Sequence, residues 1–284
     1  MTSNSDSELW KKLPWKKFRK NLFRLQCRLW KAVRVGDRKR ANNLQKLILK
    51  SRSARLLAIR QVTQLNKGKK TAGVDGKASL TFKERFDLDN LLKLQVNTWK
   101  HSKLREIPIP KKDGTSRILK VPTISDRAWQ CIIKYAIEPA HEAIFHERSY
   151  GFRPGRSAHD AQKYLFDNLR SKSNGKDKII LEMDIEKCFD RISHNHLMSQ
   201  IIAPKSAKLG LWKCLKTGVN PEFPSQGTPQ GGTCSPLLAN IALHGIETIH
   251  KSVRYADDML FIFKKGDIKQ KSLMKLLSSC VFGV

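Results

Sequence analysis

Two adjacent carboxylates interrupt an apolar run near the C-terminal end of the sequence. The run is RYADDMLFIF, Arg254 to Phe263, and its carboxylates are Asp257 and Asp258. Like charges side by side repel, and burying even one carboxylate is costly unless something positive compensates it. A bound metal ion would compensate both charges at once.

A third carboxylate, Asp184, ends a short and mostly apolar stretch from Ile179 to Met183, which is typical of a buried strand. If this strand neighbours the apolar stretch around Asp257, the carboxylates meet at the sheet edge, where they could hold two divalent ions about 4 Å apart. Mg²⁺ suits such a site because it takes hard oxygen ligands and is usually shared with substrate phosphates. A surface turn would explain the Tyr-x-Asp-Asp tetrad equally well when it is taken alone.

The N-terminal half is predicted to be mostly helical. Apolar residues at three- and four-residue spacing predict helices over residues 9–65, with Gly36-Asp37 separating two of them. A Gly- and Lys-rich loop at 66–76 is expected to be flexible and to lead into a helical stretch that ends near Lys100. Residues 105–122 alternate in polarity on both sides of a Lys-Asp-Gly turn, which predicts a β-hairpin.

The C-terminal half is predicted to alternate helices with loops and short strands. The predicted elements are a helix from Asp126 to Phe145 that Asp126 caps, a loop at 150–161 entering a helix capped by Ser157, a short helix between loops at 202–206 and 218–234, and a helix opened by the Gly/Pro-rich loop at Gly227.

The composition favours a polyanionic partner. Lys and Arg number 55 against 25 acidic residues, a formal net charge of +30. The basic residues are densest in the first hundred positions, and the predicted RNA-binding cluster there is Lys16, Lys17, Arg19 and Lys20. Such clusters indicate nucleic-acid binding, with an anionic membrane as the alternative. No apolar run approaches the roughly 20 residues of a membrane span, and the six cysteines form no CxxC pair that would indicate zinc or a disulfide framework.

Five blocks follow one another along the sequence: IPIPKKDGTSR, SYGFRPGRSAHDA, MDIEKCFDRISH, GTPQGGTCSPLLANI and RYADD. In this order they resemble the reverse transcriptase encoded by mobile group II introns, also called the intron maturase. The basic segment from Trp10 to Gly76 is similar to that family's N-terminal extension. The resemblance covers the chain from Trp10 to about Lys265. It implies an α+β fold with the fingers and palm of a right-hand polymerase, an antiparallel palm sheet and a basic helical N-terminal extension.

The resemblance also implies roles for individual residues. Asp184, the backbone carbonyl of Ile185, and Asp257 match the metal-binding groups of the palm, and Asp258 matches the auxiliary catalytic aspartate. Phe189 matches the steric gate that excludes a ribose 2′-hydroxyl. The other nucleotide-binding matches are Lys111 and Arg117 for the triphosphate, Gln230 and Gly231 beneath the sugar and base, and Tyr255 near the primer end.

Several of these residues have plainer interpretations. Phe189 could belong to the core, and Gln230 could satisfy loop backbone. Asp190 is interpreted as a structural or helix-end carboxylate. Two arginines, Arg153 and Arg156, are weak candidates for template or fingers support. Two histidines, His194 and His196, are interpreted as surface residues.

The expected domains are a basic helical extension at 1–76 and a fingers and palm domain at 77–284, incomplete at its C-terminus because the thumb of the family is absent. We expect an RNA-directed DNA polymerase that uses two Mg²⁺ ions. Its expected partners are group II intron RNA, an RNA template with a DNA primer, deoxynucleoside triphosphates and possibly a separate thumb-bearing fragment, with no membrane. The alternatives are a splicing maturase without polymerase activity and an inactive truncated remnant. The expected location is the bacterial cytoplasm, or a chloroplast or mitochondrial interior if an organelle encodes the chain.

Overall fold

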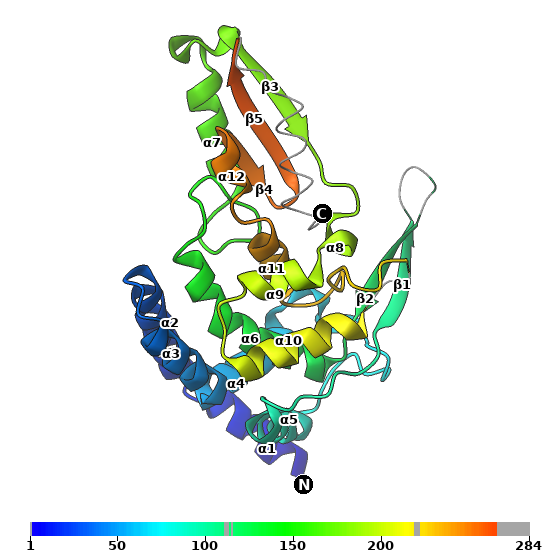
Figure 1. Cartoon of the computed structure of the whole chain (residues 1–284). Helices are drawn as coiled ribbons and strands as arrows, with labels where there is room; N and C mark the ends of the chain where they lie inside the picture. The colour runs from blue at the N-terminus through cyan, green and yellow to red at the C-terminus, as the bar shows by residue number, and fades with distance from the viewer. Residues whose placement is uncertain (1, 111–113, 115, 219–221, 266–284) are drawn as a thin grey trace. The chain divides into compact units, whose positions relative to one another are not determined.

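The computed structural model describes residues 2–110, 114, 116–218 and 222–265, and these residues form two compact units (Figure 1). The helical unit comprises Met1–Ala143, Ile201–Val219 and Pro229–Ser235. The sheet unit comprises Ile144–Gln200, Asn220–Thr228 and Pro236–Val284. Each unit is described by itself below.

The helical unit begins with a series of consecutive helices, as the apolar periodicity predicts. They are α1 (Thr2–Lys12), α2 (Trp15–Arg34), α3 (Arg38–Lys50), α4 (Arg52–Arg60) and the π-helix η1 (Gln61–Leu65). The break at Gly36-Asp37 is confirmed, because Gly36 has a φ of 75° and the Asp37 side chain caps α3 by accepting from the Arg40 N–H. A further break at Ser51 was not expected. Ser51 is extended, and its side chain accepts from the Ala54 N–H, which starts α4.

Helix α6 (Ile124–Glu142) is the central helix of this unit and packs against α2, α3 and α4. The prediction that Asp126 caps it is wrong. Thr123 is the cap, and its hydroxyl accepts from the Asp126 N–H at 3.2 Å. The Asp126 carboxylate is buried instead, where it accepts from the Trp99 Nε1 at 2.8 Å and pairs with the His101 Nδ1 at 3.4 Å.

The loop expected to be flexible at 66–76 is anchored to α6. The buried Arg127 guanidinium donates to the carbonyls of Gly68 and Thr71 at 2.9 and 2.8 Å. Gly73 lies so close to the chain that a Cβ there would approach the Thr123 Cα to 2.7 Å. The loop contains the 3₁₀-helix η2 (Lys67–Lys70), and α5 (Phe82–Gln95) follows, ending before Lys100.

The predicted hairpin is present in the helical unit. Strands β1 (Arg105–Pro110) and β2 (Ser116–Val121) are antiparallel, with Ile107 opposite Leu119. The Lys112-Asp113 turn lies outside the described residues. Helix α10 (Lys205–Thr217) completes the unit at the predicted place.

The sheet unit is built on a three-stranded antiparallel sheet of order β3-β5-β4, which Figure 1 shows with α7 and α12 beside it. Its strands are β3 (Lys178–Met183), β4 (Ser252–Tyr255) and β5 (Asp258–Lys264). Its helices are α7 (Ala158–Leu169), η3 (Ser171–Ser173), η4 (Gly175–Asp177), α8 (Cys188–Arg191), α9 (His194–Gln200), α11 (Ser235–Ala242, from Pro236 on in this unit) and α12 (Ile246–Ile249).

Helix α7 covers part of β4. It begins at the predicted cap Ser157, whose side chain accepts from the Asp160 N–H in a capping box. Ala161 of α7 packs with Tyr150 and Val253 in a buried apolar cluster. No helix within the described residues is long and apolar enough to cross a membrane.

Candidate active site

The acidic pair lies at a tight turn between β4 and β5. Tyr255 pairs with Asp258, so that Ala256 and Asp257 form the turn itself. Ala256 is buried and has a φ of 61°, a left-handed conformation that residues with a side chain adopt rarely. The two strands form a hairpin, and its turn places Asp257 at the tip.

Asp184 lies at the same edge of the sheet. The condition that the metal-site hypothesis set is met, because β3 pairs with β5 and Met183 is opposite Met259. The register ends at this pair, and Asp184 and Asp258 are the adjoining residues of the two segments at that edge. Burial raises the pKa of the Asp258 carboxyl, and the charges of Asp257 and Asp184 raise it further. The three carboxylates therefore form one electrostatic group.

The thiol of Cys188 is influenced by the same carboxylate charges. Burial raises the pKa of Cys188 to about 12, and the negative charges of Asp257 and Asp184 contribute to the increase. Cys188 begins α8, and its N–H donates to the Ile185 carbonyl at 3.2 Å. Its thiol is therefore protonated at neutral pH.

The donor set fits Mg²⁺ only as part of a shared site. Within the described ranges, no three His, Cys, Asp or Glu side chains are arranged to hold a metal ion by themselves. Hard carboxylate oxygens are present, however, and the charges of Asp257 and Asp184 raise the pKa of Asp258. One or two carboxylates completed by substrate phosphates is the usual coordination of protein-bound Mg²⁺. The assignment of Asp184, Ile185 and Asp257 as metal ligands stays a prediction.

Phe189 projects from α8 and is half-buried. Its ring makes an edge contact with Phe152, at 6.4 Å between centroids, and Phe152 is itself 50% exposed. The Phe189 carbonyl accepts from the Thr228 N–H at 2.7 Å. The backbone of Phe189 is thus fixed, while its ring lies near the surface of the unit. Tyr255 is 39% exposed.

The helical unit brings together a second set of predicted residues. The Arg117 Nε donates to the Gln230 Oε1, and the Gln230 carbonyl accepts from the Lys120 N–H of β2 at 2.7 Å. Gly231 has a φ of 119°, and a Cβ there would lie 2.8 Å from the Lys120 carbonyl oxygen. The Gly-rich loop is therefore fastened along β2, next to Arg117. Lys111 lies outside the described residues.

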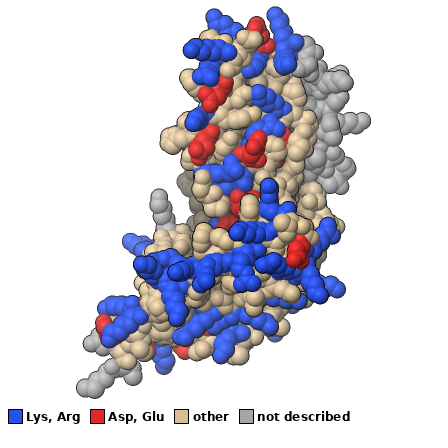
Figure 2. All heavy atoms as spheres, turned by 90° about the vertical axis from the view of Figure 1, so that its left-hand side faces the viewer, with Lys and Arg blue, Asp and Glu red and all other residues tan. Residues whose placement is uncertain are grey.

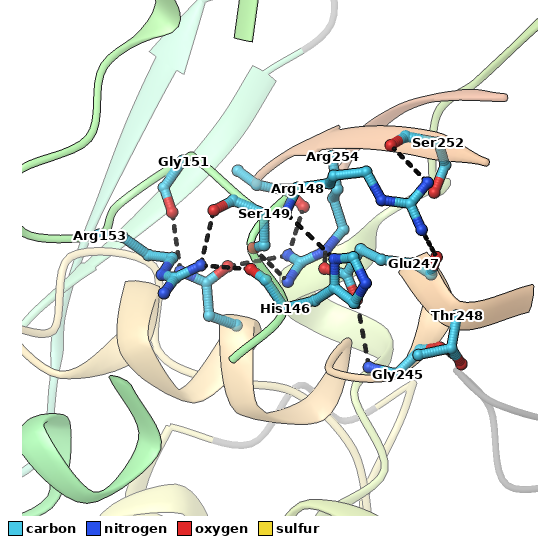
Figure 3. A network of polar contacts seen from close by, with 12 residues as sticks. His146, Arg148, Ser149, Gly151, Arg153, Gly245, Glu247, Thr248, Ser252 and Arg254 are labelled. Atoms are coloured by element: carbon cyan, nitrogen blue, oxygen red, sulfur yellow. Dashed lines mark hydrogen bonds and ion pairs between the residues drawn. The ribbon is translucent and has the colours of Figure 1, made fainter. Parts of the chain in front are cut away.

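Arg254, which makes several polar contacts near the acidic turn, was missed by the sequence analysis (Figure 3). Its guanidinium is 1% exposed and pairs with the Glu247 carboxylate at 2.6 Å. Burial is the largest single influence on Glu247 and raises its pKa, but the charge of Arg254 and the hydrogen bonds to the carboxylate together outweigh burial and lower the pKa of Glu247. The available signal was an arginine inside a short predicted strand, since an arginine is rarely fully buried unless it is paired.

Two minor interpretations are corrected in this unit. Arg153 is buried and donates to the carbonyls of His146 and Ser149, both at 2.7 Å, so it stabilises the protein chain and is not available to a template. Arg156 is half-buried and donates to the Glu147 carbonyl at 2.7 Å, and its assignment to template or fingers support stays a prediction. His194 is fully buried, with its Nε2 2.8 Å from the Gly227 carbonyl, and is therefore not a surface histidine.

The predicted RNA-binding cluster lies on α2, where every charged residue is Lys or Arg. Lys16, Lys17, Arg19 and Lys20 are all exposed. The residues of α2 that are buried, Leu22, Leu29 and Ala32, occupy the other face of the helix. Figure 2 shows that basic side chains greatly outnumber acidic ones over the face that this view presents.

Comparison with known proteins agrees with this arrangement. Residues 10–92 match the family described as the N-terminal domain of reverse transcriptase, and residues 109–281 match the reverse transcriptase (RNA-dependent DNA polymerase) family. The second match alone spans more than half of the chain. The protein therefore belongs to the reverse transcriptase family, and the resemblance noted in the sequence is confirmed.

The similar proteins include intron-encoded members of this family. Maturase-like protein 1 of Euglena gracilis is 40% identical over 93% of this chain and 57% of its own length. Its namesake in Euglena longa is 38% identical over 93% of this chain and 58% of its own length. The group II intron-encoded protein LtrA of Lactococcus lactis is 34% identical over 64% of this chain and 31% of its own length. The chain thus spans a little over half the length of the two Euglena relatives.

Proposed function

We propose that this chain carries the catalytic region of an RNA-directed DNA polymerase of a group II intron, which also binds intron RNA and takes part in splicing and mobility. The observation that carries the proposal is the meeting of Asp184 with Asp257 and Asp258 at one sheet edge. Structural carboxylates are ordinarily paired with cations or capping groups, whereas these repel one another. Such a group is suited to a cationic ligand.

Each residue then has a defined task. Asp184 and Asp257 would hold Mg²⁺ together with the Ile185 carbonyl, with Asp258 as the auxiliary carboxylate. When bound, Mg²⁺ lowers the pKa of the primer 3′-hydroxyl and neutralises charge on the leaving pyrophosphate.

The remaining site residues would hold the nucleotide. Arg117, with Lys111, would bind the triphosphate of the incoming deoxynucleotide, and Arg117 is already oriented by Gln230. Gln230 and Gly231 would lie beneath the sugar and base. The Phe189 ring would exclude a ribose 2′-hydroxyl, and Tyr255 would contact the primer end.

A second candidate function is an RNA-binding maturase whose polymerase centre is idle. The observation that favours it is the basic face of α2, which serves RNA binding whether or not DNA is made. The relatives named maturase-like are consistent with that reading. Their source in Euglena favours an organelle interior over a bacterial cytoplasm as the place of action.

The test is primer extension on an RNA template with Mg²⁺, comparing the wild-type chain with Asp257→Asn. We expect the variant to lose DNA synthesis and to bind RNA with nearly unchanged affinity, since the half-buried Asp257 carboxylate makes no contact with phosphates by itself. Asp167→Asn is the matched control, because Asp167 is an exposed aspartate of α7 in the same unit. Equal loss of synthesis and RNA affinity in Asp257→Asn would contradict the catalytic assignment.

Absence of synthesis from the wild type has a different meaning. If the chain retains tight and salt-sensitive RNA binding, that outcome selects the maturase function. If it neither binds RNA nor unfolds cooperatively, the chain is an inactive remnant.

A further inference from the structure

The Arg254 guanidinium makes contacts that go beyond what an ion pair needs. Besides Glu247, it donates to the Asn240 Oδ1 at 2.8 Å, to the Ser149 Oγ at 2.7 Å and to the Ala256 carbonyl at 2.9 Å. Burying a guanidinium is tolerated only when its donors are satisfied. Four acceptors from four different parts of the unit provide that here.

One of these acceptors belongs to the catalytic turn. Ala256 precedes Asp257 and holds the left-handed conformation that lets β4 turn into β5. Such a conformation persists at a residue with a side chain when its surroundings enforce it. The Arg254 bond to the Ala256 carbonyl fixes the peptide plane between Ala256 and Asp257, so it bears directly on where the Asp257 carboxylate points.

The opposite side of the turn is closed by the segment that contains Ser149. The Arg254 N–H donates to the Arg148 carbonyl at 3.0 Å, and the Tyr150 N–H donates to the Arg254 carbonyl at 2.9 Å. A Cβ on Gly151 would come within 2.9 Å of the Tyr255 carbonyl carbon, so only glycine lets the segment pass this close.

Asn240 ties the two sides together. Its Nδ2 donates to the Gly151 carbonyl at 2.8 Å, while its Oδ1 accepts from Arg254. The turn is consequently held between the guanidinium on one side and the Gly151 backbone on the other, and Figure 3 shows Ser149 and Glu247 beside Arg254.

We propose that Arg254 is a positioning residue for polymerisation, which acts through the Ala256 carbonyl to hold Asp257 in register with Asp184. The inference rests on the proposed polymerase function. A residue with this role affects the rate of the chemical step, because a misplacement of about 1 Å in a catalytic group can cost about a hundredfold in rate. It leaves nucleotide binding by other residues intact.

The test uses Arg254→Lys, which keeps a positive charge beside Glu247 but cannot reach the other three acceptors together, since lysine lacks the guanidinium fork. We expect kcat for primer extension to fall at least about tenfold and the KM for deoxynucleotide to stay within about twofold. Amide hydrogen exchange in a peptide spanning residues 252–259 is expected to be faster, which reports the turn without requiring activity.

Two serine variants separate positioning from general destabilisation. Ser149→Ala removes one acceptor of Arg254 and should lower kcat in the same direction by a smaller factor. Ser252→Ala is the control, because Ser252 is a buried residue of the same strand whose hydroxyl bonds to the His250 carbonyl and not to Arg254. It should leave kcat within about twofold. If Arg254→Lys does not fold, the comparison of kcat between Ser149→Ala and Ser252→Ala determines whether Arg254 positions the turn.

The proposal is overturned if Arg254→Lys or Ser149→Ala keeps kcat and exchange at wild-type values, or if Ser252→Ala lowers kcat as much as they do. A loss of activity that comes only from a higher KM, with kcat unchanged, overturns it as well. Failure of the proposed function is seen separately, as wild-type synthesis that does not depend on Asp257. In that case the exchange readout still determines whether Arg254 holds the turn.

Discussion

Neutralising the basic cluster of α2 should flatten the salt dependence of RNA binding. The perturbation replaces Lys16, Lys17, Arg19 and Lys20 together by Gln. With 3.6 residues per turn, these four positions span an arc of about 160° on the helix surface. Leu29, which packs into the core, lies on the opposite side of α2. All four cations can therefore face one phosphate backbone without disturbing the core.

The magnitude follows from counterion release. No ion pair or side-chain hydrogen bond occupies these four cations within the described part of the chain. Each phosphate contact contributes about 0.7 to the slope of log K against log salt for single-stranded RNA, so the loss of four contacts reduces the slope by about 2.8. Over a fourfold increase in salt, this difference amounts to about 50-fold in relative affinity.

The assay is fluorescence anisotropy with a single-stranded RNA oligonucleotide, titrated at several KCl concentrations between about 50 and 200 mM. The matched control neutralises Lys163, Arg170, Lys172 and Lys176, which are exposed cations of the sheet unit, and so removes the same net charge elsewhere. A slope that is unchanged in the α2 variant, or reduced equally in the control, would show that these four side chains face solvent without contacting RNA phosphates.

Two further predictions concern stability and substrate choice. Asp126→Asn should lower the free energy of unfolding by about 3 kcal/mol, because it leaves the buried His101 without its partner. Burial opposes charge on both groups, yet their pairing raises the pKa of His101 and lowers that of Asp126. The stabilisation is therefore lost as pH rises through the raised pKa of His101 or falls through the lowered pKa of Asp126, and urea unfolding should show a larger deficit at pH 6 than at pH 9. Phe189→Ala should relax discrimination against ribonucleotides by about tenfold or more in kcat/KM ratio without changing the Tm greatly, since the ring is only half-buried; unchanged discrimination would remove Phe189 from the nucleotide site.

The sequence predicted the elements whose signals are local. Hydrophobic periodicity located the N-terminal helices, and alternation located the hairpin at 105–122, because both depend on side chains close together in sequence. The pairing of β3 with β5 entered the sequence analysis as the condition for a metal site, because only a shared sheet brings Asp184, after β3, close to Asp258, at the start of β5.

Contacts between distant segments were not predictable. Asp126 has the residue type of a helix cap, but the neighbouring Thr123 takes that position and Asp126 instead meets Trp99 and His101 from an earlier loop. The anchoring of the loop at 66–76 depends on Arg127, which follows more than 50 residues later. In both cases a polar side chain is buried against backbone or a partner that only the tertiary fold supplies.

The distribution of buried arginines limits how far the net charge of +30 can be converted into RNA affinity. Arg55 is buried against Asp89, and Arg127 and Arg153 are buried against backbone carbonyls. Arg254 is buried against Glu247. Because a phosphate cannot approach these groups, they release no counterions on binding, although they count fully in the composition. The RNA-binding strength of the chain therefore depends on where cations are exposed, and α2, whose charged residues are all basic, is where the structure concentrates them.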